Sequence, residues 1–287
     1  MRNRAAQVLV IAVVAPLVVG LAVFVGMRLA RAAELAERGG HDHGGREYIE
    51  TDAGRSRLQE PLLHGFAEKI DPPQPASDFT LEDESGLEVT LSDHAEDGIV
   101  VLGFWLTRCI HGCPINAYMV AQLQQALEEE RPQVASDVTY LAVSIDPEHD
   151  TPEERRRFVN DYVTRFGGTV RFLGGEREEL EPIWGDYRVH VETRSTALEL
   201  ERLGMTEQQL LQRNELDMQS GHHAALPDEV KQGVIDAVNR AVVDDHLVVH
   251  SDMIYLIKDG RLRYRLLGHD IDAAIVADKI ASLAGRE

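Results

Sequence analysis

The most constraining feature of the sequence is a pair of cysteines placed between an apolar run and a helical pattern. Residues 99–105 are apolar and rich in β-branched side chains, which predicts a buried strand. Residues 114–130 then follow a helical pattern, and its first residue is a proline, which suits the first turn of a helix. The loop between the two holds Cys109 and Cys113, the only cysteines in 287 residues.

Two thiols in such a loop suit either a reversible disulfide or two soft metal ligands. A purely structural disulfide is disfavoured, because a bridge between Cys109 and Cys113 would close a very small loop and add little stability. Cys113 falls at the expected helix N-terminus, where the backbone N–H groups and the helix dipole favour a thiolate. The sequence therefore predicts that Cys113 is held as a thiolate.

The order of the predicted elements indicates an α/β fold of the thioredoxin-like sandwich class. A βαβ unit is followed by an antiparallel hairpin and a last helix, and the cysteine pair falls after the first central strand. The predicted elements are a hairpin at 79–91, strands at 99–105, 138–144 and 169–173, helices at 114–130, 152–166 and 176–187, a hairpin at 253–267 and a helix at 271–284.

The N-terminal region predicts a membrane anchor. Residues 8–27 contain no charged side chain and are long enough to span a bilayer as a helix. Arg2 and Arg4 precede them, so residues 1–7 are expected in the cytoplasm and the C-terminal domain on the exported, periplasmic side of the cytoplasmic membrane. A cleaved signal peptide is the alternative, but its apolar core is usually about 7–15 residues.

The remaining chain divides into a tether and one folded domain. Residues 28–76 lack a strand pattern and end in a proline-rich stretch, which predicts a tether. Within this tether, His41 and His43 flank an aspartate. The two histidines are expected to be solvated, and loose binding of a metal ion is the alternative. Residues 77–287 are expected to form the domain, with a helical insertion at 192–247.

The net charge of −20 opposes a nucleic-acid partner, because phosphate recognition needs a basic face. A basic protein or a metal ion remains compatible with this charge.

Three sequence blocks together resemble the SCO/SenC family. The first is Cys109 to Pro114, the second is the run SIDPEHDT at residues 144–151, and the third is His250 just before a late strand. The likeness covers roughly residues 77–190 and 248–284. It implies a membrane-anchored thioredoxin-fold protein that handles copper during assembly of cytochrome c oxidase.

The resemblance also implies the ligands of a copper ion, namely Cys109, Cys113 and His250. Two thiolates and one imidazole suit Cu(I), which is soft and accepts low coordination numbers. The sequence departs from the family at Ile110, where a proline is common, and at His111, where an acidic residue is common. It departs further in the length of the segment at 192–247.

Other candidate residues carry weaker signals. His111 lies in the same loop, where it would be either a fourth ligand or gate, or a plain solvated side chain. Asp146 and Asp150 are expected to shape the turn beside the site. Met218, His222 and His223 combine soft and nitrogen donors at close spacing. They would form either an auxiliary copper or docking site or a plain polar loop between helices.

Several functions fit the cysteine pair. The preferred one is a copper chaperone, not an enzyme, which passes copper to the copper-site subunit of a respiratory oxidase or to another copper carrier. A thiol–disulfide oxidoreductase that reduces the recipient's cysteines is the alternative; it would not need His250, and no proline after Pro227 can supply the usual active-site cis-proline. A thiol peroxidase fits poorly, because Thr107 precedes Cys109 by two residues and not three. A sensor that signals through the tether is also compatible with the sequence.

Overall fold

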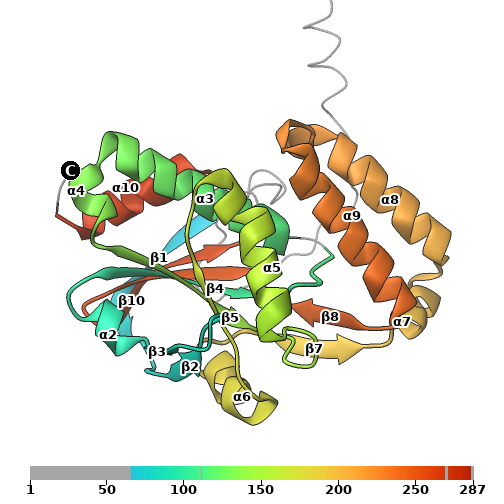
Figure 1. The fold of residues 1–287 in the computed structure, drawn as a ribbon, viewed down its shortest axis with the longest axis horizontal. Helices are drawn as coiled ribbons and strands as arrows, with labels where there is room; N and C mark the ends of the chain where they lie inside the picture. The colour runs from blue at the N-terminus through green and yellow to red at the C-terminus, as the bar shows by residue number, and fades with distance from the viewer. Residues whose placement is uncertain (1–65, 111, 269–270, 286–287) are drawn as a thin grey trace, which may run out of the picture. The chain divides into compact units, whose positions relative to one another are not determined.

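The computed structural model describes residues 66–110, 112–268 and 271–285, with the side chain of His222 left out (Figure 1). Its centre is a six-stranded sheet with the strand order β1-β10-β9-β4-β5-β6. The strands of this sheet are β1 (Phe66–Pro75), β4 (Ile99–Trp105), β5 (Val138–Ser144), β6 (Arg171–Leu173), β9 (Met253–Lys258) and β10 (Arg261–Leu267). β4, β5 and β6 run parallel, and β9, β10 and β1 complete the sheet by antiparallel pairing.

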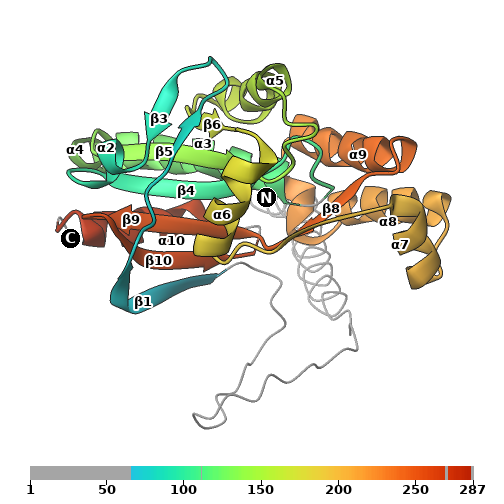
Figure 2. The same ribbon diagram turned by 90° about the horizontal axis from the view of Figure 1, so that it is seen from below.

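Helices cover both faces of this sheet, which gives the predicted thioredoxin-like sandwich. α3 (Cys113–Glu130), α5 (Pro152–Tyr162) and α10 (Ala273–Leu283) lie on one face, and α6 (Arg177–Asp186) lies on the other (Figures 1 and 2). All seven residues of β4 are buried, as expected for a parallel strand enclosed by helices on both sides. The strand that leads into the cysteine loop is therefore anchored in the middle of the core.

Local sequence signals explain where several elements begin and turn. The hydroxyl of Thr151 accepts a hydrogen bond from the Glu154 N–H and caps α5. The β9–β10 turn uses Asp259 and Gly260, which both have positive φ, as a two-residue hairpin requires. The shorter elements are β2 (Thr80–Glu82), β3 (Glu88–Thr90), α2 (Ser92–Ala95), α4 (Pro132–Ala135) and η1 (Thr164–Phe166).

The segment between α6 and β9 contains three α-helices enclosed by a pair of short strands. β7 (Val191–Arg194) pairs antiparallel with β8 (Leu247–His250), so the segment leaves and rejoins the domain at the same place. The elements between these strands are α7 (Thr196–Leu203), α8 (Glu207–Gln219), η2 (Gly221–Ala225) and α9 (Asp228–Val243). We call residues 195–246 the helical segment; its α8 and α9 lie side by side (Figure 1).

The structure corrects the predicted start of the folded domain. β1 was predicted as part of the tether, but it pairs with β10 at the edge of the sheet. The pairing is regular from Phe66 to Lys69 and resumes at Gln74, and two of its prolines lie in the irregular stretch between. An edge strand tolerates proline because one side of it needs no backbone donor, so the proline-rich stretch does not mark a boundary.

The predicted cytoplasmic N-terminus, the membrane span at 8–27 and most of the tether, with His41 and His43, lie outside the described residues. Within the residues that the structure describes, no helix is long and apolar enough to cross a membrane.

Candidate metal centre

The cysteine loop connects β4 to α3 and buries both thiols. Cys109 and Cys113 are 2% and 0% exposed, and both are free thiols. Cys113 is the first residue of α3, and Pro114 follows it in the first turn. The backbone N–H of Cys113 donates to Sγ of Cys109 over 3.3 Å, so the helix N-terminus directs this N–H at the other cysteine.

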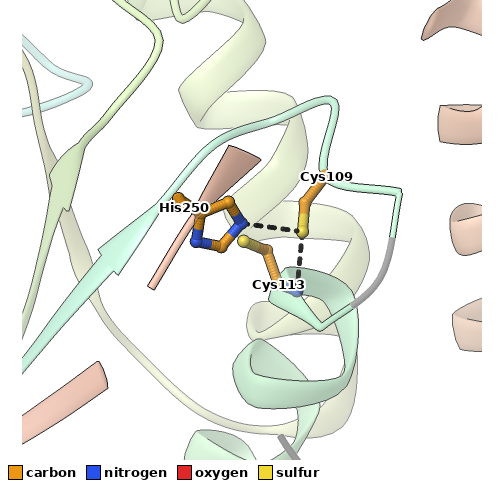
Figure 3. Close-up of side chains that lie close together, drawn as sticks. All are labelled: Cys109, Cys113 and His250. Atoms are coloured by element: carbon orange, nitrogen blue, oxygen red, sulfur yellow. Dashed lines mark hydrogen bonds between the residues drawn. The ribbon is translucent and has the colours of Figure 1, made fainter. Parts of the chain in front are cut away.

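His250 reaches the cysteine loop from a distant part of the chain. It is the last residue of β8, and its Nε2 lies 3.5 Å from Sγ of Cys109 (Figure 3). Its Nδ1 lies 3.3 Å from the carbonyl oxygen of Ser251 and 3.7 Å from Oδ1 of Asp252. In a neutral imidazole whose proton lies on Nδ1, beside the Ser251 carbonyl, Nε2 would be available as a ligand.

The structure thus brings together Cys109, Cys113 and His250, the three residues that the resemblance implies as copper ligands. One ligand atom from each lies within 4.8 Å of the other two, and the three side chains converge in Figure 3. Such a set of two sulfurs and one imidazole nitrogen can hold a soft metal ion, and the same two thiols can form a disulfide.

The two thiols have opposite pKa shifts, and the prediction of a thiolate at Cys113 is wrong. Burial opposes ionisation of Cys109, yet its hydrogen bonds with Cys113 and His250 hold its pKa well below the usual range. Burial and the neighbouring Cys109 thiolate raise the pKa of Cys113 well above its usual range. Burial opposes protonation of His250, but the Cys109 thiolate raises its pKa to about 9. The structure therefore favours a Cys109 thiolate beside a His250 imidazolium, with Cys113 protonated.

Asp150 ties the cysteine loop to the end of β5. Its carboxylate accepts hydrogen bonds from the Thr107 N–H at 2.8 Å and from the Ser144 hydroxyl at 2.6 Å. Burial, together with the charge of Asp146, raises the pKa of Asp150 to about 7. These contacts fit the structural role expected for Asp150.

The helical segment packs against the cysteine loop, a contact that the sequence did not reveal. Ile110 lies in an apolar cluster with Val238 and Ala241 of α9, and the Arg108 guanidinium pairs with the Asp244 carboxylate. Ile110 replaces a residue that is often proline in the resembled family, so this departure has a packing partner. Its partners lie about 130 residues away, and no local pattern marks the contact.

Of the remaining sequence candidates that the structure describes, Met218 and His223 do not join the cysteine site. Met218 is buried in an apolar cluster with Ile115, Val230 and Val234, so it serves the core. Nδ1 of His223 lies 3.5 Å from the Asp217 carboxylate. The side chain of His222 and all of His111 fall outside the described residues. Sequence reasoning also missed His246, which contacts Asp146.

Comparison with known proteins identifies the family of this chain. The family model described as SCO1/SenC matches residues 67–215, which is more than half of the chain. The chain belongs to the SCO1/SenC family. This confirms the resemblance found in the three sequence blocks.

Individual SCO1 relatives are distant in sequence. The SCO1 protein homolog of Bacillus subtilis is 25% identical over 128 residues, which are 45% of this chain and 58% of that protein. The mitochondrial SCO1 homolog of Homo sapiens is 26% identical over 152 residues, which are 53% of this chain and 46% of that protein. The chain therefore spans about half the length of the curated relatives that it matches.

A solved SCO structure supports the fold. The crystal structure of yeast Sco1 superposes with a TM-score of 0.50 and 18% identity, covering 74% of this chain and 99% of that one. At this level of identity the likeness concerns the fold, and it confirms the predicted thioredoxin-like α/β architecture. A crystal structure of yeast Sco1 with copper bound has a TM-score of 0.49 and 19% identity, covering 75% of this chain and 91% of that one.

Proposed function

We propose that this chain is a copper-binding assembly factor that holds Cu(I) between Cys109, Cys113 and His250. It then passes the ion to the copper centre of a respiratory cytochrome c oxidase by ligand exchange. The observation that supports this function is the convergence of two thiols and one imidazole within 4.8 Å. Membership in the SCO1/SenC family agrees with it.

The donor atoms favour Cu(I) over harder ions. Cu(I) prefers soft thiolate ligands and accepts imidazole, and three ligands satisfy it. The Cys109 thiolate is already favoured without metal, so copper has to displace the proton of Cys113 and any proton on Nε2 of His250. Because no electron is exchanged in this step, the ion can pass to another set of thiolate and imidazole ligands without a co-reactant.

A Cu(I) titration of the reduced full chain against a competing chelator, without oxygen, tests this proposal. We expect tight binding of one Cu(I) by the wild type and loss of that binding in the Cys109→Ser/Cys113→Ser chain. His250→Ala should weaken the binding by more than about tenfold, because one of the three ligands is lost. The matched control is His190→Ala, whose side chain is 62% exposed and lies next to β7.

Two results would contradict the proposal. One is weak binding by the wild type, and the other is an affinity that His250→Ala leaves equal to that of His190→Ala. A Cu(I) equivalent that survives loss of both cysteines would instead indicate a separate site elsewhere in the chain.

A thiol–disulfide exchange function is the second candidate, and the unequal pKa values of the two thiols favour it. The Cys109 thiolate would attack a partner disulfide, releasing one partner thiolate and forming a mixed disulfide. Cys113, once deprotonated, would then attack Cys109, so that the partner leaves with two reduced sulfurs and Cys109–Cys113 becomes the disulfide. Two electrons pass to the partner, whose two sulfurs leave as thiolates that take up the proton lost by Cys113 and one proton from solvent.

The role of His250 separates the two functions. The rate of exchange with a model disulfide should depend on both cysteines. In His250→Ala this rate should fall only in proportion to the fraction of Cys109 that is no longer a thiolate. If His250→Ala abolishes Cu(I) binding but keeps exchange at a pH where Cys109 is ionised, both activities belong to the same pair of thiols. If wild-type exchange is no faster than that of a free thiol, the reductase function is rejected.

The proposal also places the protein at the cytoplasmic membrane, with residues 8–27 as a single span and the domain on the exported side. This rests on the uncharged run and on the two arginines that precede it. Fractionation of the source cells should recover the chain in membranes washed with carbonate. Protease added to whole cells should digest the domain only after the cell envelope outside the cytoplasmic membrane has been permeabilised. Recovery in the soluble fraction would reject the anchor.

A further inference from the structure

Asp146, His149 and His246 form a second cluster of ligand-type side chains, separate from the cysteines. Asp146 follows the end of β5, and His149 lies in the turn that precedes α5. His246 is the last residue of the helical segment, between α9 and β8, and it lies 100 positions after Asp146 in the chain. The fold therefore joins the core domain to the helical segment at this point.

Both imidazoles converge on one oxygen of the carboxylate. Nδ1 of His149 lies 3.2 Å from Oδ1 of Asp146, and Nε2 of His246 lies 3.1 Å from the same oxygen. The two rings are stacked at an angle, with their centroids 4.1 Å apart. One ligand atom from each residue lies within 4.8 Å of the other two, which is compact enough for a single ion.

The second oxygen of Asp146 supplies an independent sign of a missing partner. Asp146 is 0% exposed, and in the described part of the chain its Oδ2 has no hydrogen-bond partner. A buried carboxylate oxygen without a partner is costly, because it has lost its water and gained nothing in return. A cation bound by this carboxylate would compensate that cost.

Metal ions can approach the cluster from its histidine side. The side chains of His149 and His246 are 24% and 15% exposed, so they stand between the buried carboxylate and solvent. The nearby Glu148 is already engaged, since it accepts a hydrogen bond from Nε of Arg177 at 2.8 Å. The protein therefore offers three ligands and leaves further positions of an ion to water.

We propose that Asp146, His149 and His246 form a second metal site that binds a borderline divalent ion such as Zn²⁺ or Cu²⁺. Two imidazole nitrogens and one carboxylate oxygen suit divalent first-row ions, whereas the absence of sulfur from this ligand set disfavours Cu(I). The site is thus chemically distinct from the cysteine site. It also fastens His246, four residues before His250, to the end of β5.

Zn²⁺ binding by the full chain in mild detergent tests the proposal. The background chain carries Cys109→Ser and Cys113→Ser, which remove the cysteine site, and His41→Gln and His43→Gln, which remove the histidine pair near the N-terminus. Equilibrium dialysis should give one bound Zn²⁺ per background chain. Adding His149→Gln or His246→Gln should weaken this binding by more than about tenfold.

His190→Gln in the same background is the matched control, because His190 is exposed and belongs to neither cluster. It should bind Zn²⁺ like the background chain. Cu²⁺ loaded into the background and control chains should show two imidazole nitrogens by electron paramagnetic resonance, and one fewer after His246→Gln. A second background with alanine at both cysteine positions guards against a folding defect caused by serine.

Two results would overturn the proposal. One is failure of both background chains to bind Zn²⁺ while they unfold cooperatively. The other is Zn²⁺ binding that stays the same in His149→Gln, His246→Gln and His190→Gln. Either result would mean that the three side chains only hydrogen-bond to one another and bind no metal. Neither result bears on the cysteine site, so the proposed function is tested separately.

Discussion

Cys109 and Cys113 are four positions apart and both buried, but their surroundings give their thiols opposite pKa shifts. Cys109 receives the N–H of Cys113 and faces His250, so its negative charge has two partners. Cys113 faces that thiolate, which disfavours a second negative charge. The helix N-terminus does stabilise a thiolate, as the sequence suggested, but it is the thiolate of the preceding cysteine.

This asymmetry predicts the ultraviolet titration of the reduced, metal-free chain. One thiolate should absorb near 240 nm at neutral pH and disappear only as the pH falls well below the usual range for cysteine. Because the pKa of His250 is about 9, the thiolate–imidazolium pair exists between the lowered pKa of Cys109 and about pH 9. The stability contributed by the pair is lost as pH falls through the former value and as it rises through the latter.

His250→Ala should raise the pKa of Cys109, since the thiolate then loses a hydrogen bond and a positive charge. The control His190→Ala should leave the titration curve unchanged. Two thiols that titrate together near the ordinary cysteine value would show that this description of the site is wrong.

At the scale of elements, the cysteine loop is held between β4, α3 and the helical segment. β4 fixes the start of the loop in the core, and α3 fixes its end at Cys113. Ile110 and Arg108 connect the middle of the loop to α9 and the residue that follows it. The segment that also delivers His250 through β8 therefore buttresses the loop that holds the two thiols.

Ile110→Ala tests this buttress. The substitution should lower the free energy of unfolding by about 2–4 kcal/mol, because a buried side chain is lost from a packed cluster. It should also speed alkylation of Cys109 in the folded protein, because the loop is less firmly held. Leu198→Ala, at a position 66% exposed on α7, should change neither quantity. Equal alkylation rates in the two variants would contradict a buttressing role.

The edge strand β1 offers a second test at this scale. A chain that begins at residue 71 lacks the four pairs that Phe66 to Lys69 make with β10. Its free energy of unfolding, measured by urea denaturation, should be about 1–3 kcal/mol lower than that of a chain beginning at residue 60. A chain beginning at residue 66 should match the longer one. If the chain from residue 71 is equally stable, these pairs add nothing to the domain.

At the scale of the whole molecule, the contacts that sequence reasoning could not foresee are those between distant segments. The β4–loop–α3 unit was predictable because hydrophobic patterning, a proline and two cysteines lie within one short stretch. The family blocks then indicated His250. The contact between Asp146 and His246 joins residues 100 positions apart, and neither lies in a pattern that marks the other.

The start of the domain was missed for a different physical reason. Prolines usually end regular structure, but at Pro72 and Pro73 they occupy an irregular stretch of an edge strand. Whether a strand lies at an edge depends on the final order of the sheet, which local sequence does not contain.

The central claim, that Cys109, Cys113 and His250 hold Cu(I), is tested most directly by X-ray absorption at the copper edge. The reduced full chain loaded with one equivalent of Cu(I) should show two sulfur ligands and one imidazole nitrogen. His250→Ala should keep the two sulfurs and lose the imidazole. A wild-type spectrum without sulfur, or a spectrum that His250→Ala leaves unchanged, would contradict the account.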